Sequence, residues 1–138
     1  MIVLDTNVIS DLMRPQPDPR VLAWANSLKP DGVAITAMNE AEILHGLARL
    51  PEGRRRQALR QNWDALVEEL FATRNLPFTS TAAHWYGELL VRRERMARPM
   101  ATADAVIAAI ALANSAALAT RNTNDFSGIG LELINPWL

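Results

Sequence analysis

Nine consecutive apolar residues, 105–113, follow Asp104 in the C-terminal third of the chain. A helix that is apolar on every side is stable only when neighbouring elements cover all of its faces. We therefore predict a buried helix over residues 102–114, enclosed by other secondary structure. The run is too short to cross a bilayer, so a membrane location is not expected.

Short apolar runs alternate with helical patterns along the rest of the chain. Strands are predicted at residues 2–4, 33–36, 76–78, 116–120 and 131–134. Helices are predicted at residues 8–13, 20–28, 37–50, 52–72, 79–96 and 102–114. Pro77 makes the third strand an edge strand, and Ser80 or Thr81 is expected to cap the helix over 79–96. Strands separated by helices indicate an α/β fold with a mainly parallel sheet.

The length of 138 residues favours a single domain spanning residues 1–138. Apolar residues make up 49% and charged residues 21%, as in folded proteins. The absence of cysteine excludes disulfides, thiolate metal sites and cysteine nucleophiles, and agrees with a cytoplasmic location. The sequence begins without a basic leader or a long apolar stretch, so no signal peptide is expected.

Four acidic residues occupy positions that a parallel sheet brings to one edge. Asp5 follows the first predicted strand, Glu42 lies in the helix after the second, and Asp104 opens the apolar helix. Asp125 follows the strand over 116–120. Ligands of open α/β sheets bind beyond the carboxyl ends of the strands. Each acid also has a structural explanation, as a helix cap, a solvated helix face or a turn residue.

Carboxylates that gather at one edge repel each other unless a cation lies between them. Mg²⁺ and Mn²⁺ prefer carboxylate oxygens and water as ligands. Such an ion can activate a water molecule and stabilise the charge on a phosphodiester under attack. The four acids therefore predict metal-assisted hydrolysis of a phosphate ester.

Four separated motifs resemble those of PIN-domain proteins. They are IVLDTNVIS at 2–10, AEI with a glycine four residues after the glutamate at 41–46, TADAVIAAIA at 102–111, and ATRN followed by DF at 119–126. The ending NPW at 135–137 is similar to the FitB-like branch of VapC-type toxins. The motifs occur in the family's order and cover almost the whole chain.

The resemblance implies a PIN-like three-layer α/β/α sandwich and a Mg²⁺- or Mn²⁺-dependent endoribonuclease. It implies that the chain is the toxin of a type II toxin–antitoxin pair, with RNA as substrate. Asp5 and Asp104 would be the main metal ligands, and Glu42 would complete the site. Many relatives carry aspartate in the place of Asn122, so Asp125 would supply the missing carboxylate, and the number of metal ions stays open. A homodimer and a small antitoxin, whose C-terminal segment occupies the cleft, are implied as partners.

Polar residues beside these acids are candidates for holding them or the substrate. Thr6, Asn7 and Thr120 would bind carboxylates or water through hydrogen bonds, with ordinary capping as the alternative. Asn122 could also bind the metal or a water. Arg121 could contact the scissile phosphate or form a salt bridge. His45, one turn beyond Glu42, is not favoured as a general base, because metal-bound hydroxide needs none.

Two groups of arginines could follow an RNA backbone, although charge runs on helices are usually solvated faces. The first comprises Arg49, Arg54, Arg55, Arg56 and Arg60, and the second comprises Arg92, Arg93, Arg95 and Arg98. The net charge of −1 neither requires nor excludes nucleic acid as a partner.

Two other functions fit parts of the pattern. A phosphatase that forms an aspartyl phosphate needs a second acid two residues after the first, but position 7 is Asn7, and the only lysine is Lys29. A non-catalytic module of the same fold that binds nucleic acid or protein is the stronger alternative, because Asn122 brings no charge.

Overall fold

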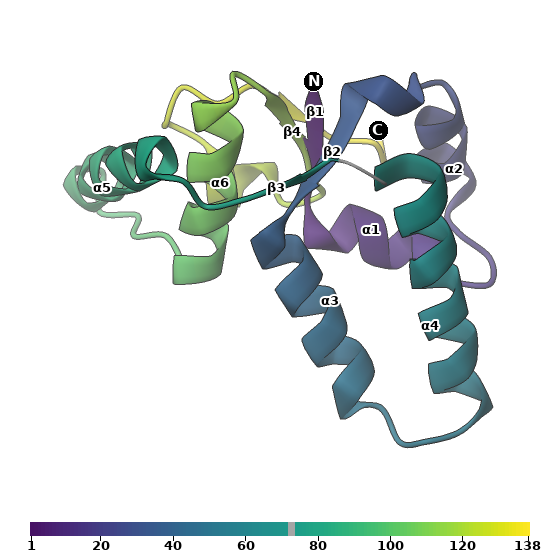
Figure 1. Cartoon of the computed structure of the whole chain (residues 1–138). Helices are drawn as coiled ribbons and strands as arrows, with labels where there is room; N and C mark the ends of the chain where they lie inside the picture. Colours follow the sequence, from purple (N-terminus) through teal and green to yellow (C-terminus); the bar gives the residue numbers. More distant parts are fainter. Residues whose placement is uncertain (72–73) are drawn as a thin grey trace.

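The computed structural model describes residues 1–71 and 74–138 and contains a five-stranded sheet (Figure 1). Its strand order is β3-β2-β1-β4-β5, and every pair of neighbours is parallel. The strands are β1 (Ile2–Leu4), β2 (Val33–Thr36), β3 (Asn75–Leu76), β4 (Ala117–Ala119) and β5 (Leu133–Ile134). The predicted parallel sheet is confirmed, and β3 lies at its edge as predicted. The predicted bounds of this strand, 76–78, were wrong, because β3 ends before Pro77.

Within the part of the chain that the structure describes, six α-helices connect the strands. They are α1 (Thr6–Met13), α2 (Pro19–Asn26), α3 (Ala37–Arg49), α4 (Arg54–Leu66), α5 (Ser80–Arg95) and α6 (Thr102–Ala113). Short 3-10 helices, η1 (Pro30–Gly32) and η3 (Thr123–Phe126), precede β2 and follow β4. No helix within the described residues is both long and apolar enough to span a membrane.

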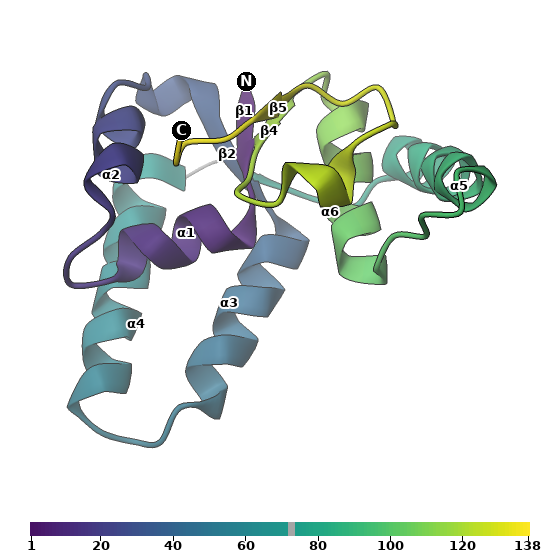
Figure 2. The ribbon, with the colours of Figure 1, turned by 180° about the vertical axis from the view of Figure 1, so that it is seen from behind.

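Helices cover both faces of the sheet, with α1 to α4 on one side and α5 and α6 on the other (Figures 1 and 2). Side chains of a strand point alternately to its two faces. Val3 accordingly packs in the core with α5 and α6, and Leu4 packs in the core with α1 and α3. The central strands are therefore buried on both faces, which confirms the three-layer arrangement.

The apolar helix predicted over 102–114 is α6, and a continuous stretch of it is buried. Ala105 and the five residues from Ile107 to Ala111 are buried. They lie between the sheet and α5. Because the sheet and α5 enclose this helix, its N-terminal turn is fixed at the edge of the core. That turn carries Asp104.

Several predicted boundaries differ from the structure. The helix predicted over 52–72 begins at Arg54 and stays α-helical to Leu66, and a π-helical turn, η2, follows over Val67–Phe71. Its predicted end, Ala72, lies outside the described residues. The cap of α5 is Thr79, whose Oγ1 accepts a hydrogen bond from the Ala82 amide, so the prediction of Ser80 or Thr81 was wrong.

Candidate functional site

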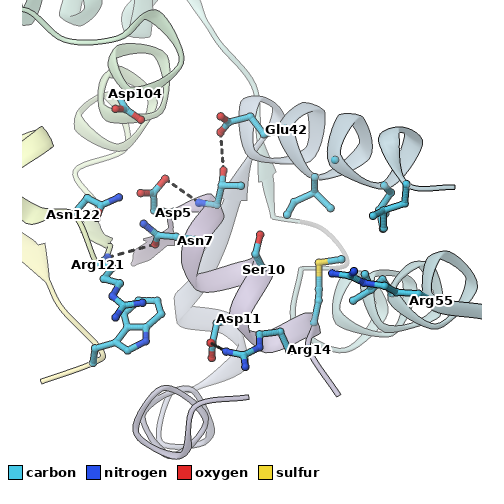
Figure 3. Close-up of a pocket in the computed structure, with 18 residues that line it drawn as sticks. Asp5, Asn7, Ser10, Asp11, Arg14, Glu42, Arg55, Asp104, Arg121 and Asn122 are labelled. Atoms are coloured by element: carbon cyan, nitrogen blue, oxygen red, sulfur yellow. Dashed lines mark hydrogen bonds and ion pairs between the residues drawn. The ribbon is translucent and has the colours of Figure 1, made fainter. Parts of the chain in front are cut away.

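A pocket of about 690 Å³ opens at the carboxyl ends of the strands, and three predicted acids line it. Asp5 follows β1 directly, Glu42 lies on α3, and Asp104 lies in the first turn of α6. Figure 3 shows their carboxylates turned toward one space. Three acids that are distant in sequence therefore meet at the predicted edge of the sheet.

Asp5 is held on both carboxylate oxygens. Its Oδ1 accepts a hydrogen bond of 2.8 Å from the amide of Thr6, so Asp5 caps α1. Its Oδ2 accepts a hydrogen bond of 2.7 Å from the hydroxyl of Thr120 at the end of β4. Burial raises the pKa of Asp5, these hydrogen bonds oppose that shift, and the charges of Glu42 and Asp125 add to it. The carboxylate is thus fixed in place while it remains surrounded by negative charge.

Glu42 is oriented by a chain of polar side chains that starts at the cap of α3. The side chains and amides of Thr36 and Asn39 form a reciprocal capping box, and both residues are fully buried. Asn39 Nδ2 donates a 3.0 Å hydrogen bond to the hydroxyl of Thr6. That hydroxyl donates a 2.7 Å hydrogen bond to Glu42 Oε1. Thr6 therefore contacts Asp5 through its amide and Glu42 through its side chain.

The electrostatic effect of placing several acids close together is clearest at Asp104. Its pKa is raised to about 6, first by burial and then by the charges of Asp5, Asp125 and Glu42. The charge of Arg93 acts in the opposite direction. A carboxyl group with this pKa is ionised at neutral pH but repelled by its neighbours. A cation in the pocket would relieve that repulsion.

Asp125 lies in η3, is exposed, and is not one of the residues that line the pocket. Its charge nevertheless raises the pKa of both Asp5 and Asp104. Asn122 does line the pocket. Its backbone amide donates a 3.1 Å hydrogen bond to the hydroxyl of Thr120. The structure thus places Asn122 at the pocket wall and Asp125 within electrostatic range of the acids.

The donor set fits a hard divalent cation. Mg²⁺ commonly binds through one or two carboxylates and keeps several water ligands. Across residues 1–71 and 74–138, no three acidic or histidine side chains are placed to bind one ion directly. Burial first, and then neighbouring acids, raise the pKa of Asp5 and of Asp104. An ion bound directly by one or two of these carboxylates, with water as its other ligands, agrees with the raised pKa values and with the lack of a three-residue ligand group among the described residues.

The wall of the pocket opposite α3 is formed by Asn7, by Arg121 and Asn122 after β4, and by Trp137 near the C-terminus. Asn7 Nδ2 donates a 3.4 Å hydrogen bond to the Thr120 hydroxyl, and Asn7 Oδ1 accepts one of 3.4 Å from the Arg121 amide. The guanidinium of Arg121 lies 5.2 Å from the ring centroid of Trp137. This stacking orients an exposed arginine beside the pocket, where it can meet a phosphate.

The other end of the pocket combines apolar and basic groups, including Ile43, Leu47, Leu59, Arg14 and Arg55. Arg14 forms a 3.1 Å salt bridge with Asp11, and Figure 3 shows Arg55 at the side of α4 that faces the pocket. The pocket is therefore acidic at one end and basic at the other.

Not every residue of the predicted arginine groups is available to RNA. Arg93 is buried, whereas Arg60 stays exposed in a 3.4 Å ion pair with Asp64. For Arg93, the prediction of a contact with RNA was therefore wrong. His45 is exposed and does not line the pocket, as expected for a residue outside the site.

Sequence reasoning missed two contributors to the site, Asn39 and Trp137. The capping pattern of a threonine followed three residues later by a polar residue, Thr36 and Asn39, was available as a signal. Nothing in the sequence indicated that the tryptophan of the ending NPW would lie beneath Arg121.

The family model of the PIN domain matches residues 2–130 of the chain. The chain belongs to the PIN-domain family. Three curated PIN-like relatives align over 137 residues: the plasmid stability protein StbB of Pseudomonas syringae, with 42% identity, the VapC ribonuclease Y4jK of Sinorhizobium fredii, with 39%, and the toxin FitB of Neisseria gonorrhoeae, with 39%. Each alignment covers 99% of this chain and at least 98% of the relative.

The PIN fold is also seen in the crystal structure of FitAcB from Neisseria gonorrhoeae. One of its chains matches this chain with a TM-score of 0.91 and 39% identity, and the match covers 99% of both chains. The predicted three-layer fold is therefore the fold of a solved relative.

Proposed function

We propose that this PIN-domain chain is a Mg²⁺- or Mn²⁺-dependent endoribonuclease and acts as the toxin of a type II toxin–antitoxin system. The observation that carries the proposal is the meeting of Asp5, Glu42 and Asp104 in one pocket, with the pKa of Asp104 raised to about 6. The relatives named VapC ribonuclease and toxin FitB, which align over nearly the whole chain, support the activity and the biological role.

Asp5 and Asp104 would hold the metal ion, with Glu42 contributing directly or through water and Asp125 through water. The bound ion would activate a water molecule and offset the charge on the scissile phosphate and the leaving oxygen. Thr120 and the Thr6 amide fix the Asp5 carboxylate, and the Thr6 hydroxyl fixes Glu42. Attack by water rather than by the RNA 2′-hydroxyl would leave 5′-phosphate and 3′-hydroxyl ends.

Arg121 would orient the RNA backbone. Arg121 is exposed, lines the same pocket as the acids, and has its guanidinium over the ring of Trp137. A planar guanidinium can donate two parallel hydrogen bonds to a phosphate. The positive charge would also lower the repulsion between the phosphate and the acidic end of the pocket.

The proposal includes a small antitoxin and a homodimer as partners. The pocket combines apolar side chains with charged ones, which suits the C-terminal segment of a partner protein. Light scattering of the isolated chain should give twice the mass of the monomer. A monomer at every workable concentration would remove the homodimer from the proposal.

Cleavage of structured RNA by purified protein tests the proposed activity. We expect Mg²⁺ or Mn²⁺ to be required, EDTA to stop cleavage, and Asp5→Asn or Asp104→Asn to reduce the rate by at least about 100-fold. Asp31→Asn is the matched control, because Asp31 is exposed in η1 and lies outside the pocket. Its rate should equal that of the unchanged chain.

Full activity of either pocket variant would contradict the proposed metal site. Binding of Mn²⁺ without cleavage of any RNA offered would instead favour the non-catalytic binding module. The length and end groups of the products, read by sequencing, separate internal cleavage from digestion of the ends.

A further inference from the structure

Arg93 is a buried cation on α5 that is paired with carbonyl groups rather than with an acid. Its exposed fraction is 4%, and no salt bridge involves it within the described residues. Its Nε donates a 2.6 Å hydrogen bond to the carbonyl of Arg98, and its Nη1 donates to the carbonyls of Asp125, at 3.1 Å, and Ser127, at 2.8 Å. Arginine is rarely buried unless such partners satisfy it.

The three carbonyls belong to two segments that carry parts of the proposed metal site. Arg98 lies in the loop that leads into α6, and the first turn of α6 carries Asp104. Asp125 belongs to η3, and Ser127 is the first residue after the end of η3. One guanidinium therefore bridges the segment that presents Asp104 and the segment that presents Asp125.

The loop before α6 is held to Arg93 at a second point. The amide of Arg98 donates to the Arg93 carbonyl at 2.9 Å, and the amide of Ala97 donates to the Glu94 carbonyl at 2.9 Å. These two bonds form a Schellman motif, in which Ala97 adopts a φ of 55°. This conformation is strained for a residue other than glycine, so it depends on the surrounding contacts.

Two further contacts join the same segments. The guanidinium of Arg98 donates to the carbonyl of Asn124 at 2.7 Å and to the hydroxyl of Ser127 at 3.2 Å. Met96, at the end of α5, lies so close to Gly128 that a Cβ at position 128 would be 2.6 Å from Met96 Cε. The end of α5 and the segment after β4 are thus in tight contact, and Arg93 is at the buried centre of that contact.

We propose that Arg93 is a positioning residue: it locks η3 to the loop before α6 and thereby sets the spacing of Asp125 and Asp104 at the metal site. The expected effect of Arg93 on RNA cleavage rests on the proposed function. The link that Arg93 makes between the two segments does not. The charge of Arg93 also lowers the pKa of Asp104, which places the guanidinium within electrostatic range of the acids.

Arg93→Lys tests this role because lysine keeps the charge but cannot bridge three carbonyls from two segments with the same planar fork. Arg95→Lys is the matched control, because Arg95 is an exposed arginine on the same helix. Three quantities are measured: amide hydrogen exchange over residues 122–127 without metal, Mn²⁺ affinity by calorimetry, and kcat and KM for RNA cleavage.

We expect Arg93→Lys to keep the fold, to accelerate exchange at 122–127, and to weaken Mn²⁺ binding by about 10-fold. The kcat should fall by a similar factor, with little change in KM, and Arg95→Lys should match the unchanged chain in hydrogen exchange and Mn²⁺ affinity. If Arg93→Lys does not fold, Arg98→Lys replaces it. Arg98 is exposed and ties the same segments, so the same loss in exchange protection and Mn²⁺ affinity is expected.

Exchange at 122–127 and Mn²⁺ affinity equal to those of the unchanged chain would overturn the role of Arg93, as would an equal loss in Arg95→Lys. If the unchanged chain cleaves no RNA, the proposed function fails. Hydrogen exchange and Mn²⁺ affinity still decide the role of Arg93 in that case, because neither depends on catalysis.

Discussion

Asp104 shows how the site is built at the scale of a single residue. Its carboxyl group lies in the first turn of a helix, where the macrodipole favours a negative charge. Burial and three neighbouring acids act in the opposite direction and raise its pKa to about 6. The balance leaves an ionised but repelled carboxylate near neutral pH, which is the state that a metal ligand requires.

The raised pKa of Asp104 has a consequence for stability without metal. An acid whose pKa is higher in the folded state than in the unfolded state stabilises the fold below its unfolded pKa of 3.8, and this contribution is lost as pH rises through about 6. Asp104→Asn removes the charge. We therefore expect the variant to be more stable than the unchanged chain at pH 7.5, by about 1–2 kcal/mol after partial solvent screening.

Urea unfolding in EDTA at pH 4 and pH 7.5 measures this difference. The gain should shrink toward pH 4, where Asp104 is protonated in the folded protein. A variant that is less stable at pH 7.5, or a gain independent of pH, would contradict the electrostatic description of the pocket.

The sequence predicted the acids of the site better than the residues that hold them. Asp5 and Asp104 could be predicted because each stands at the junction of an apolar element and a polar turn. Asn39 had a capping pattern with Thr36 that was not used. Arg93 could not be predicted, because a buried polar residue inside a helix looks like a surface residue until its partners are known. The partners of Arg93 lie as many as 34 positions away in the sequence.

At the scale of elements, the order and type of the helices and strands were predictable, but several ends were not. The apolar spacing of residues 52–72 does not distinguish an α-helix from the π-helical turn over Val67–Phe71. The helix predicted from Val8 begins at Thr6 because Asp5 caps it. That shift matters for the site, since it places the Thr6 amide against the Asp5 carboxylate.

The segment after β4 places an uncharged side chain, Asn122, at the pocket wall. We expect Asn122→Asp to strengthen Mn²⁺ binding by several-fold, since an added carboxylate at the pocket wall raises the charge of the ligand set. Calorimetry reports both the affinity and the number of ions bound.

A second bound ion in Asn122→Asp, absent from the unchanged chain, would show that Asn122 limits the site to one metal. Arg121→Gln serves as a control for general changes at this wall, because it alters the neighbouring charge without adding a carboxylate. Unchanged or weaker Mn²⁺ binding in Asn122→Asp would show that position 122 does not face the ion.

At the scale of the whole molecule, the three-layer fold explains why distant acids meet. The parallel strands end at one edge of the sheet, and α1 and α3 begin there on one face, while α6 begins there on the other (Figure 1). The pocket therefore receives Asp5 and Glu42 from one helical layer and Asp104 from the opposite layer. Its acidic end depends on the packing of both layers against the sheet.

The central claim is that Asp5 and Asp104 bind the same ion, and a double-mutant cycle of Mn²⁺ affinity tests it most directly. Calorimetry at pH 7.5 compares the unchanged chain with Asp5→Asn, Asp104→Asn and the double variant. We predict that each single substitution weakens binding by about 10-fold or more and that the double variant loses less than the product of the two losses. Unchanged affinity in either single variant, or losses that multiply independently, would contradict a shared ion.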